Sequence, residues 1–307
     1  CPGCGTRVKA APLAPGSPFG PNIQALSLYL KHVQHISYQR LQAMFADVFG
    51  LTISQGALGN IFDRARASFH GKAVAILARL RTADAVASDE TGVRIEGVNA
   101  QHWVFRADGI VFHQAAFSRG AQVVRDVMGG HRPAFWTSDR YSAQQGHGER
   151  HQTCLAHLAR DIAYALEVSD DPAPLRLKLW MGDLFALWRH LGTFAASTIT
   201  RKRRSMENRI GEILCARSDC DVTGALLRKI ANAREQLLTF LDAPGLLQPT
   251  NNDCERALRP AVINRKVTNG FRANWAAQAD ADVRTVIDTE RLDGIGPYLA
   301  IRNTIIP

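Results

Sequence analysis

Three acidic residues, far apart along the chain, stand where their side chains could converge on one metal site. Asp89 ends a strand-like run that starts at Val86, Asp139 ends a second run that starts at Phe135, and Glu255 lies near the start of a predicted helix. Carboxylate oxygens are the hard ligands that Mg²⁺ prefers, and on a basic protein such a site indicates phosphodiester chemistry. We therefore predict that the three acids form a catalytic metal site.

Composition and charge favour a soluble protein with a polyanionic partner. The chain has 307 residues, 46% of them hydrophobic, so it can bury a substantial core around a catalytic domain with smaller attachments. Its 37 Lys and Arg exceed its 28 Asp and Glu, and the net charge of +9 suits a partner such as DNA. No stretch reaches the roughly 18 apolar residues of a membrane span. Six scattered cysteines are too few for a disulfide framework, so a cytoplasmic location with reduced thiols is expected.

The segments around the first two acids are rich in β-forming residues. Gly97 and the pair Asp108-Gly109 are turn signals that predict an antiparallel three-stranded meander. A helix, a fourth strand, a short fifth strand and another helix follow. The predicted elements are strands over 86–95, 102–106 and 110–117, a helix over 121–128, strands over 135–138 and 151–155, and a helix over 157–166. This order is typical of a ribonuclease H-like core, in which the first and fourth strands are parallel neighbours.

The N-terminal region has helical periodicity over residues 22–69. A second helix is predicted to start after Ser37 and end at Gly50, and a third to start with Ser54 as its N-cap. Two interpretations stay open. The helices could form a helix-turn-helix unit with residues 55–66 as the recognition helix, or a plain three-helix bundle, which is favoured because the small residues at the start of that helix offer few side chains to bases.

A purely helical pattern separates the second acid from the third. The basic run 201–204 lies between the first two helices predicted in this insertion. A final helix over 276–291 is predicted to pack on the sheet. The fold class is thus α/β: a ribonuclease H-like mixed five-stranded sheet with flanking helices, a helical N-terminal region and an all-helical insertion. Helices of the insertion are predicted over 175–191, 206–215 and 226–241. The predicted domains are a partial zinc-ribbon remnant and linker (1–20), the helical N-terminal region (21–80), the first part of the core (81–168), the insertion (169–248), the second part of the core (249–292) and a C-terminal helical tail (293–307).

The opening Cys1-Pro2-Gly3-Cys4-Gly5 has the spacing of a zinc knuckle. Two thiolates make half of a tetrahedral site, and the nearest further candidates, His32 and His35, lie in a helical pattern. We expect a possible Zn²⁺ half-site at Cys1 and Cys4 that forms the second half of a ribbon begun upstream, with a metal-free turn as the alternative.

Each acid also has a plainer structural interpretation. A lone Asp at a strand end more often caps a turn than binds a metal, although two at matching ends favour the site. Glu255 could complete a capping box with Asn252 as the N-cap, worth roughly 1 kcal/mol, or form an i,i+4 ion pair with Arg259. Spacing alone leaves these uses of Glu255 open.

Ordered motifs connect the acids. They are Ser88-Asp89-Glu90-Thr91-Gly92, Ser138-Asp139-Arg140-Tyr141, Cys154-Leu155-Ala156-His157-Leu158-Ala159-Arg160-Asp161 and Asn251-Asn252-Asp253-Cys254-Glu255-Arg256-Ala257-Leu258-Arg259-Pro260, with Tyr38-Gln39-Arg40-Leu41, Ser54-Gln55-Gly56 and Arg265-Lys266-Val267-Thr268-Asn269-Gly270-Phe271-Arg272 around them. In these motifs, over almost the whole chain, the sequence resembles the DDE transposases of the insertion-sequence-66 family. The departures are Asp253-Cys254 beside the glutamate and the weakly basic Glu290-Arg291-Leu292-Asp293, which put full transposition competence in doubt.

The resemblance implies a DNA transposase with a ribonuclease H-like catalytic core, and it places the family's acid triad on Asp89, Asp139 and Glu255. These acids would hold two Mg²⁺ or Mn²⁺ ions, so that water nicks the transposon end and the freed 3′-hydroxyl joins target DNA. The implied partners are transposon-end and target DNA, further copies of the chain assembled on DNA, and accessory proteins, in a nucleoid-associated location. The predicted DNA-binding residues are Arg140, His157, Arg160, Arg256, Arg259, Arg265 and Lys266.

Alternatives remain for these residues and for the function. His157 and Arg160 would contact the scissile phosphate, with a packed, hydrogen-bonded His as the alternative; Cys154 and His157 have metal-like spacing, but two ligands make no zinc site. The basic residues after Glu255 could instead form a solvated face. The rival functions are a nuclease that cuts without joining and a catalytically inactive, truncated remnant that only binds DNA.

Overall fold

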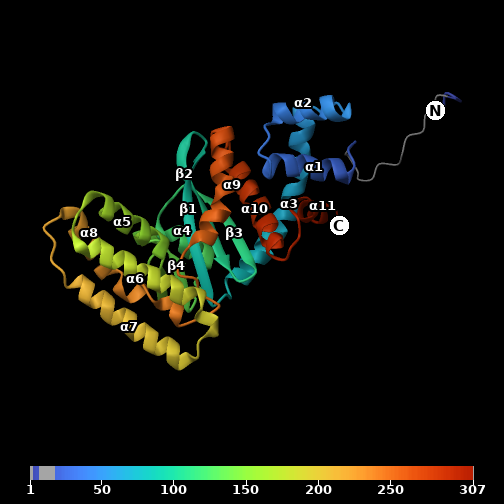
Figure 1. Ribbon diagram of the computed structural model, residues 1–307. Helices are drawn as coiled ribbons and strands as arrows, with labels where there is room; N and C mark the ends of the chain where they lie inside the picture. The colour runs from blue at the N-terminus through green and yellow to red at the C-terminus, as the bar shows by residue number, and fades with distance from the viewer. Residues whose placement is uncertain (1–2, 7–17, 307) are drawn as a thin grey trace.

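A five-stranded mixed sheet forms the centre of the protein. In the computed structural model, which describes residues 3–6 and 18–306, the strands lie in the order β3-β2-β1-β4-β5 (Figure 1). β1 with β2 and β2 with β3 are antiparallel pairs, whereas β1 with β4 and β4 with β5 are parallel. The bounds are β1 Ala85–Ile95, β2 Val98–Ala107, β3 Ile110–Ala116, β4 Phe135–Ser138 and β5 Arg150–Thr153. The predicted α/β sheet with parallel first and fourth strands is confirmed.

Two tight turns build the antiparallel part of the sheet. Glu96 and Gly97 both have positive φ, 54° and 80°, as a two-residue loop between twisted strands requires. The second turn contains Gly109 with φ 60°, and the paired residues Ala107 and Ile110 close it. Both predicted turn signals are therefore confirmed.

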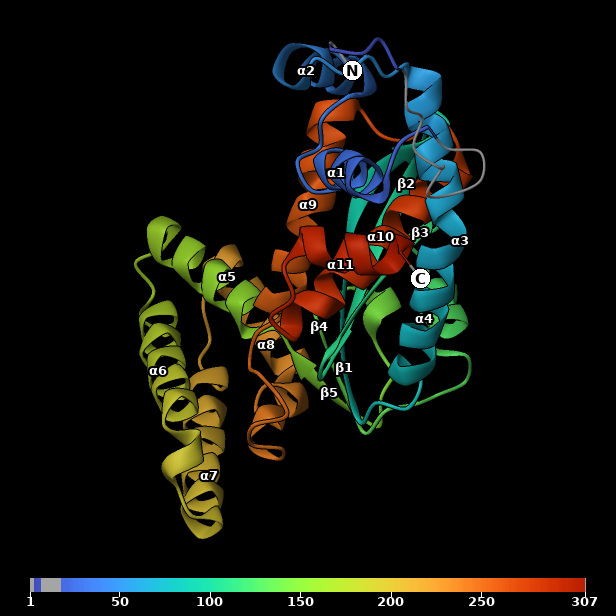
Figure 2. The same ribbon diagram turned by 90° about the vertical axis from the view of Figure 1, so that its right-hand side faces the viewer.

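Two helices from the C-terminal third pack on different parts of the sheet. α9 (Asn252–Thr268) lies across β1 and β2, and α10 (Asn274–Leu292) lies along β3 (Figures 1 and 2). Thr289 of α10 accepts a hydrogen bond from the Val111 N–H at 3.1 Å and donates one to the Val111 carbonyl at 2.9 Å. Side chains of α10 thus satisfy backbone groups that an edge strand leaves open.

The main core lies on the other face of β1 and β2. Trp103, Phe105 and Trp136 are fully buried there against helices that come before, between and after the strands in the sequence. These helices are α1 (Pro21–His32), α3 (Gln55–Leu80), α4 (Ala121–Met128), α10 and α11 (Pro297–Ile305). The predicted helix over 121–128 has those same bounds, and α11 lies within the residues predicted as the C-terminal tail.

The N-terminal helices begin and end where polar and glycine residues predict. Ser37 caps α2 (Tyr38–Phe49) by accepting from the Arg40 N–H, and Ser54 caps α3 by accepting from the Ala57 N–H at 3.1 Å. Gly50 ends α2 in the left-handed conformation, at φ 60°. The helices pack through a small cluster of their own, and the helix-turn-helix interpretation stays a prediction.

A body of helices lies at the end of the sheet away from α1 and α2 (Figures 1 and 2). It shares one hydrophobic cluster and contains α5 (Leu155–Val168), α6 (Pro172–Arg189), α7 (Ala196–Leu214) and α8 (Asp221–Asn232). Two sequence predictions are wrong here. The basic run 201–204 lies inside α7, because it contains no helix-breaking residue, and the predicted helix over 226–241 stops at Asn232. Two 3₁₀ turns follow, where Thr239 donates to the His151 carbonyl at 2.7 Å and so packs this segment on β5.

No helix within residues 3–6 and 18–306 combines the length and the apolar character needed to cross a bilayer.

Candidate metal and nucleic-acid site

β1 and β4 bring Asp89 and Asp139 to equivalent positions. The parallel register pairs Ala87 with Thr137, and each aspartate follows two residues later. Each is held locally: one oxygen of Asp139 accepts from the Tyr141 N–H and one of Asp89 from the Glu90 N–H, both at 2.9 Å. Both side chains are half-buried. Asp139 directly follows the end of β4, whereas Asp89 lies inside β1, just past the pairing with β4, so the prediction that Asp89 ends its strand is wrong.

Packing of α9 places the start of this helix, which carries Glu255, beside β1, although the ligand atoms of Asp89, Asp139 and Glu255 do not all lie within 4.8 Å of one another. Cys254 and Leu258 are buried against strand residues on the face of the sheet that also holds Ala87. The Asn251 amide, just before the helix, donates to the Ser88 carbonyl at 2.8 Å and so ties the start of α9 to β1. Because side chains alternate along a strand, Asp89 shares the face of Ala87 and points toward α9.

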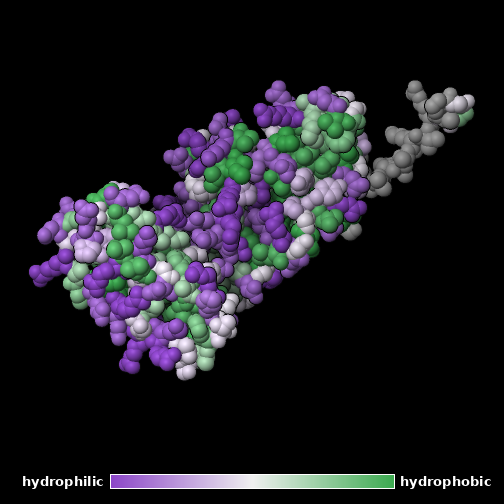
Figure 3. Space-filling model, in the orientation of Figure 1, coloured by the Kyte–Doolittle hydropathy of each residue, from purple (hydrophilic) through white to green (hydrophobic). Residues whose placement is uncertain are grey.

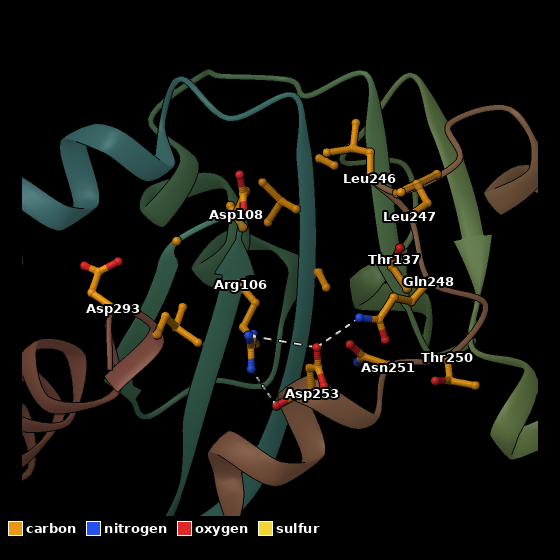
Figure 4. A pocket seen from close by; sticks show the side chains of 17 residues that line it. Arg106, Asp108, Thr137, Leu246, Leu247, Gln248, Thr250, Asn251, Asp253 and Asp293 are labelled. Atoms are coloured by element: carbon orange, nitrogen blue, oxygen red, sulfur yellow. Dashed lines mark hydrogen bonds and ion pairs between the residues drawn. The ribbon is translucent and has the colours of Figure 1, made fainter. Parts of the chain in front are cut away.

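A second set of hydrogen bonds holds the start of α9 against β2. Arg106 of β2 donates to the Asp253 carbonyl at 3.4 Å, and Gln248 donates to the Asp253 carboxylate at 3.2 Å (Figure 4). These residues line a pocket of about 630 Å³ between β1, β2 and the segment before α9, and all three acids lie outside it. The pocket therefore belongs to the support of α9 rather than to the acid cluster.

Negative charge accumulates around Asp89. Its pKa is raised to about 7, first by burial and then by the charges of Glu90, Asp139 and Glu255, against a hydrogen bond from the Glu90 N–H that lowers it. A cation among these groups relieves the repulsion, and a cluster of carboxylates is the oxygen donor set that Mg²⁺ takes. The carboxylates around Asp89 therefore fit a divalent ion of the magnesium type.

A network that the sequence analysis missed borders the two aspartates. Glu90, whose side chain is only 2% exposed, accepts from Arg119 at 2.7 Å and from Gln144 at 2.5 Å. The Arg119 guanidinium also lies over the Tyr141 ring, 4.0 Å from its centroid. Arg119 thereby connects the residue after Asp89 with the segment after Asp139. Strand alternation could have shown that Glu90 points away from Asp89, but no sequence signal indicates Arg119.

The partners of Glu255 are neither Asn252, as in the predicted capping box, nor Arg259, as in the predicted ion pair. Arg160 donates to its Oε1 at 3.0 Å, and the Nε2 of His157 lies 3.9 Å from the same atom. The capping box is wrong, because Asn251 is the N-cap and its amide is used on Ser88. Among the described residues, the ion pairs of Glu255 are with these two side chains of α5 and do not include Arg259.

The other predicted DNA-binding residues fall into two groups. Arg140 pairs with Asp161 at 3.1 Å, Arg256 pairs with Asp253, and Arg265 donates to the Gly92 carbonyl, so these three have internal contacts. Arg259 and Lys266 are exposed on α9. Hydrophilic side chains gather over the middle of the face that carries α9 (Figure 3).

The predicted zinc half-site is described only in part. Cys1 lies outside the described residues, whereas Cys4 is exposed and its Sγ lies 3.2 Å from the Thr6 hydroxyl. His32 is bonded to Asp280 at 2.7 Å, and His35 is buried. The two histidines considered as further ligands thus have places in the main fold.

The comparisons with known proteins identify the family of the chain. The family model described as Transposase IS66 family matches residues 16–279. A search of the curated proteins finds no relative that matches the chain.

Proposed function

Because the chain belongs to the Transposase IS66 family, we propose that it cuts transposon ends and joins them to target DNA with Asp89, Asp139 and Glu255 as its metal ligands. The observation that supports the proposal is the placement of the acids by the fold. The β1–β4 register puts Asp89 and Asp139 at matching positions, and the Asn251 amide bonded to the Ser88 carbonyl holds the start of α9, which carries Glu255, beside β1.

Two magnesium ions bound by these acids would activate the attacking water and stabilise the leaving 3′ oxygen. The protein's own part is to fix the ligands: backbone N–H groups orient Asp89 and Asp139, and Arg160 orients Glu255. The freed 3′-hydroxyl then attacks a phosphodiester of target DNA, so that joining requires no covalent bond to the enzyme.

Positively charged residues of α9 would bind the backbone phosphates of DNA beside the acids. Arg259 and Lys266 are exposed and free to approach phosphates, whereas Arg265 supports β1 through the Gly92 carbonyl. Each phosphate contact contributes about 0.9 to the log–log slope of affinity against salt concentration. We therefore assign Arg259 and Lys266 to DNA binding and Arg265 to positioning of the strand that bears Asp89.

The test compares DNA cleavage by the parent chain and by the variant Asp139→Asn. The substrate is duplex DNA that contains the terminal sequences of the transposable element encoding the chain. The parent protein is expected to nick these ends when Mg²⁺ is present, and the variant to bind DNA equally and cut it at least about a hundredfold more slowly. Asp47→Asn, an exposed residue of α2, is the matched control and is expected to cut normally.

Pre-cut ends separate the rival functions. Joining of these ends to a target plasmid supports a transposase, whereas cutting without joining indicates a nuclease. Binding with no Mg²⁺-dependent cutting indicates a remnant that only binds DNA. Identical products from the parent chain and Asp139→Asn would refute the assignment of the acids.

A further inference from the structure

Three side chains of different chemistry meet on the α5 side of Glu255. One ligand atom each of Cys154, His157 and Glu255 lies within 4.8 Å of the other two. Cys154 is the N-cap of α5, His157 lies in the first turn of that helix, and Glu255 comes from α9. The fold therefore adds a third ligand to the two that the Cys-x-x-His spacing provides.

The donor set differs from that of a magnesium site. A thiolate sulfur, an imidazole nitrogen and a carboxylate oxygen suit zinc and its neighbours, and three protein ligands leave one position open. Magnesium takes oxygen ligands and leaves thiols and imidazoles alone. We propose that Cys154, His157 and Glu255 form a binding site for a transition-metal dication of the zinc class.

The cluster is partly preorganised for such an ion. The Asn251 N–H donates to the Cys154 sulfur at 3.2 Å, and the N–H groups of Ala156 and His157 also hydrogen-bond to it. These bonds favour the thiolate, but burial outweighs them and raises the pKa of the Cys154 thiol, so the thiolate needs the charge of a bound ion. Nδ1 of His157 is buried and has no hydrogen-bond partner among the described residues. Binding of the ion releases the thiol proton to solvent.

The site is accessible although its sulfur is buried. Cys154 is fully buried, whereas the side chains of His157 and Glu255 are each 35% exposed. Glu255 and Arg160 also line an open pocket of about 570 Å³ between α5, α6 and the start of α9. An ion can therefore enter from solvent and meet the carboxylate and imidazole before the sulfur.

Occupancy of this site has a consequence for the acid triad. Glu255 would be a ligand both here and among the magnesium ligands, so a zinc-class ion withdraws it from the triad and inhibits DNA cleavage. This consequence rests on the proposed function, whereas the metal site itself does not.

The test uses Co²⁺ as the probe, added to the full chain carrying Cys1→Ser and Cys4→Ser so that the N-terminal thiols cannot contribute. A thiolate-to-Co²⁺ charge-transfer absorption is expected, and Zn²⁺ should abolish it by displacement. Cys154→Ser is expected to remove the absorption. Cys254→Ser is the matched control, because Cys254 is equally buried and lies beside Glu255 on α9; it should keep the absorption.

The proposed site is overturned if Co²⁺ produces no charge-transfer absorption, or if the absorption is still present in Cys154→Ser. If Cys154→Ser fails to fold by circular dichroism, His157→Gln and Glu255→Gln decide: each should weaken Co²⁺ binding at least about tenfold, and unchanged affinity in both refutes the site. Failure of the proposed function looks different, because the absorption would then persist in a protein that does not cut DNA with Mg²⁺.

Discussion

Arg160 on α5 donates a hydrogen bond of 3.0 Å to Glu255 on α9. The residues that separate them in the sequence form the rest of the helical body, so this contact connects that body to an acid of the candidate site. The Arg160 side chain is 62% exposed, and an ion pair in such a place adds little to the stability of the fold. Its effect should therefore be on the orientation of the carboxylate.

Arg160→Gln is expected to slow Mg²⁺-dependent DNA cleavage roughly ten- to a hundredfold, because a misplaced ligand weakens the geometry that the reaction requires. The melting temperature should change little. Single-turnover cleavage at saturating DNA measures the effect without the contribution of binding.

The matched control for that prediction is Arg259→Gln, which changes an exposed arginine of α9. It should weaken DNA binding and lower the log–log salt slope by about 0.9, with cleavage of bound DNA preserved. If Arg160→Gln behaves in this second way, Arg160 contacts phosphate, as the sequence analysis predicted, and does not orient Glu255.

Local signals in the sequence predicted the sheet well. The turns at Gly97 and Gly109 require special backbone angles, and apolar alternation marks the strands between them, so neither depends on distant parts of the chain. The parallel pairing of β1 with β4 then followed from the order of elements. The matching positions of Asp89 and Asp139 in the β1–β4 register could be predicted for the same reason.

Long-range packing decided the features that the sequence analysis missed. The helix predicted over 226–241 ends early because Thr239 bonds to β5, and Asn251 rather than Asn252 is the N-cap of α9 because its amide reaches Ser88. Arg119 meets Glu90 only when the loop after β3 folds back over the sheet. No spacing along the chain indicates such contacts.

Arg119→Ala is expected to destabilise the fold by about 1–3 kcal/mol, because it leaves the buried Glu90 carboxylate without its cation. The exposure of Arg119 favours the lower end of this range. Thermal unfolding measures the loss. A second variant, Arg119→Ala with Glu90→Gln, removes the unpaired charge and should recover much of the stability; equal loss in both variants would show that packing of Arg119 on Tyr141 matters instead.

Gly270→Ala is expected to destabilise the protein by about 2 kcal/mol or more. Gly270 has φ 106°, and a Cβ there would collide with the Arg94 carbonyl, where the chain after α9 pairs with the end of β1. Chemical denaturation measures the change. Gly182→Ala is the control: Gly182 lies inside α6, a Cβ meets open space there, and the change should stabilise by about 0.5–1 kcal/mol. A mild effect at Gly270 would mean that this pairing is dispensable.

A buried histidine pair should make the fold sensitive to acid. His102 lies 3.0 Å from His113, which lies 3.2 Å from Asp288, and burial together with the charge of His113 lowers the pKa of His102 to about 3. The unfolded chain takes up a proton at His102 near pH 6.5, whereas the folded one does not until about pH 3. Stability is therefore expected to fall as the pH drops below 6.5, by about 2 kcal/mol at pH 5 from this residue alone.

His102→Gln should remove that part of the pH dependence. The variant loses a buried hydrogen bond and is expected to be less stable than the parent at pH 8, but the difference between them should shrink toward pH 5, because Gln does not titrate. Urea unfolding at several pH values between 8 and 5 measures both curves. His190→Gln changes an exposed histidine at the end of α6 and should follow the parent curve. Parallel curves for the parent and His102→Gln would mean that other groups cause the acid sensitivity.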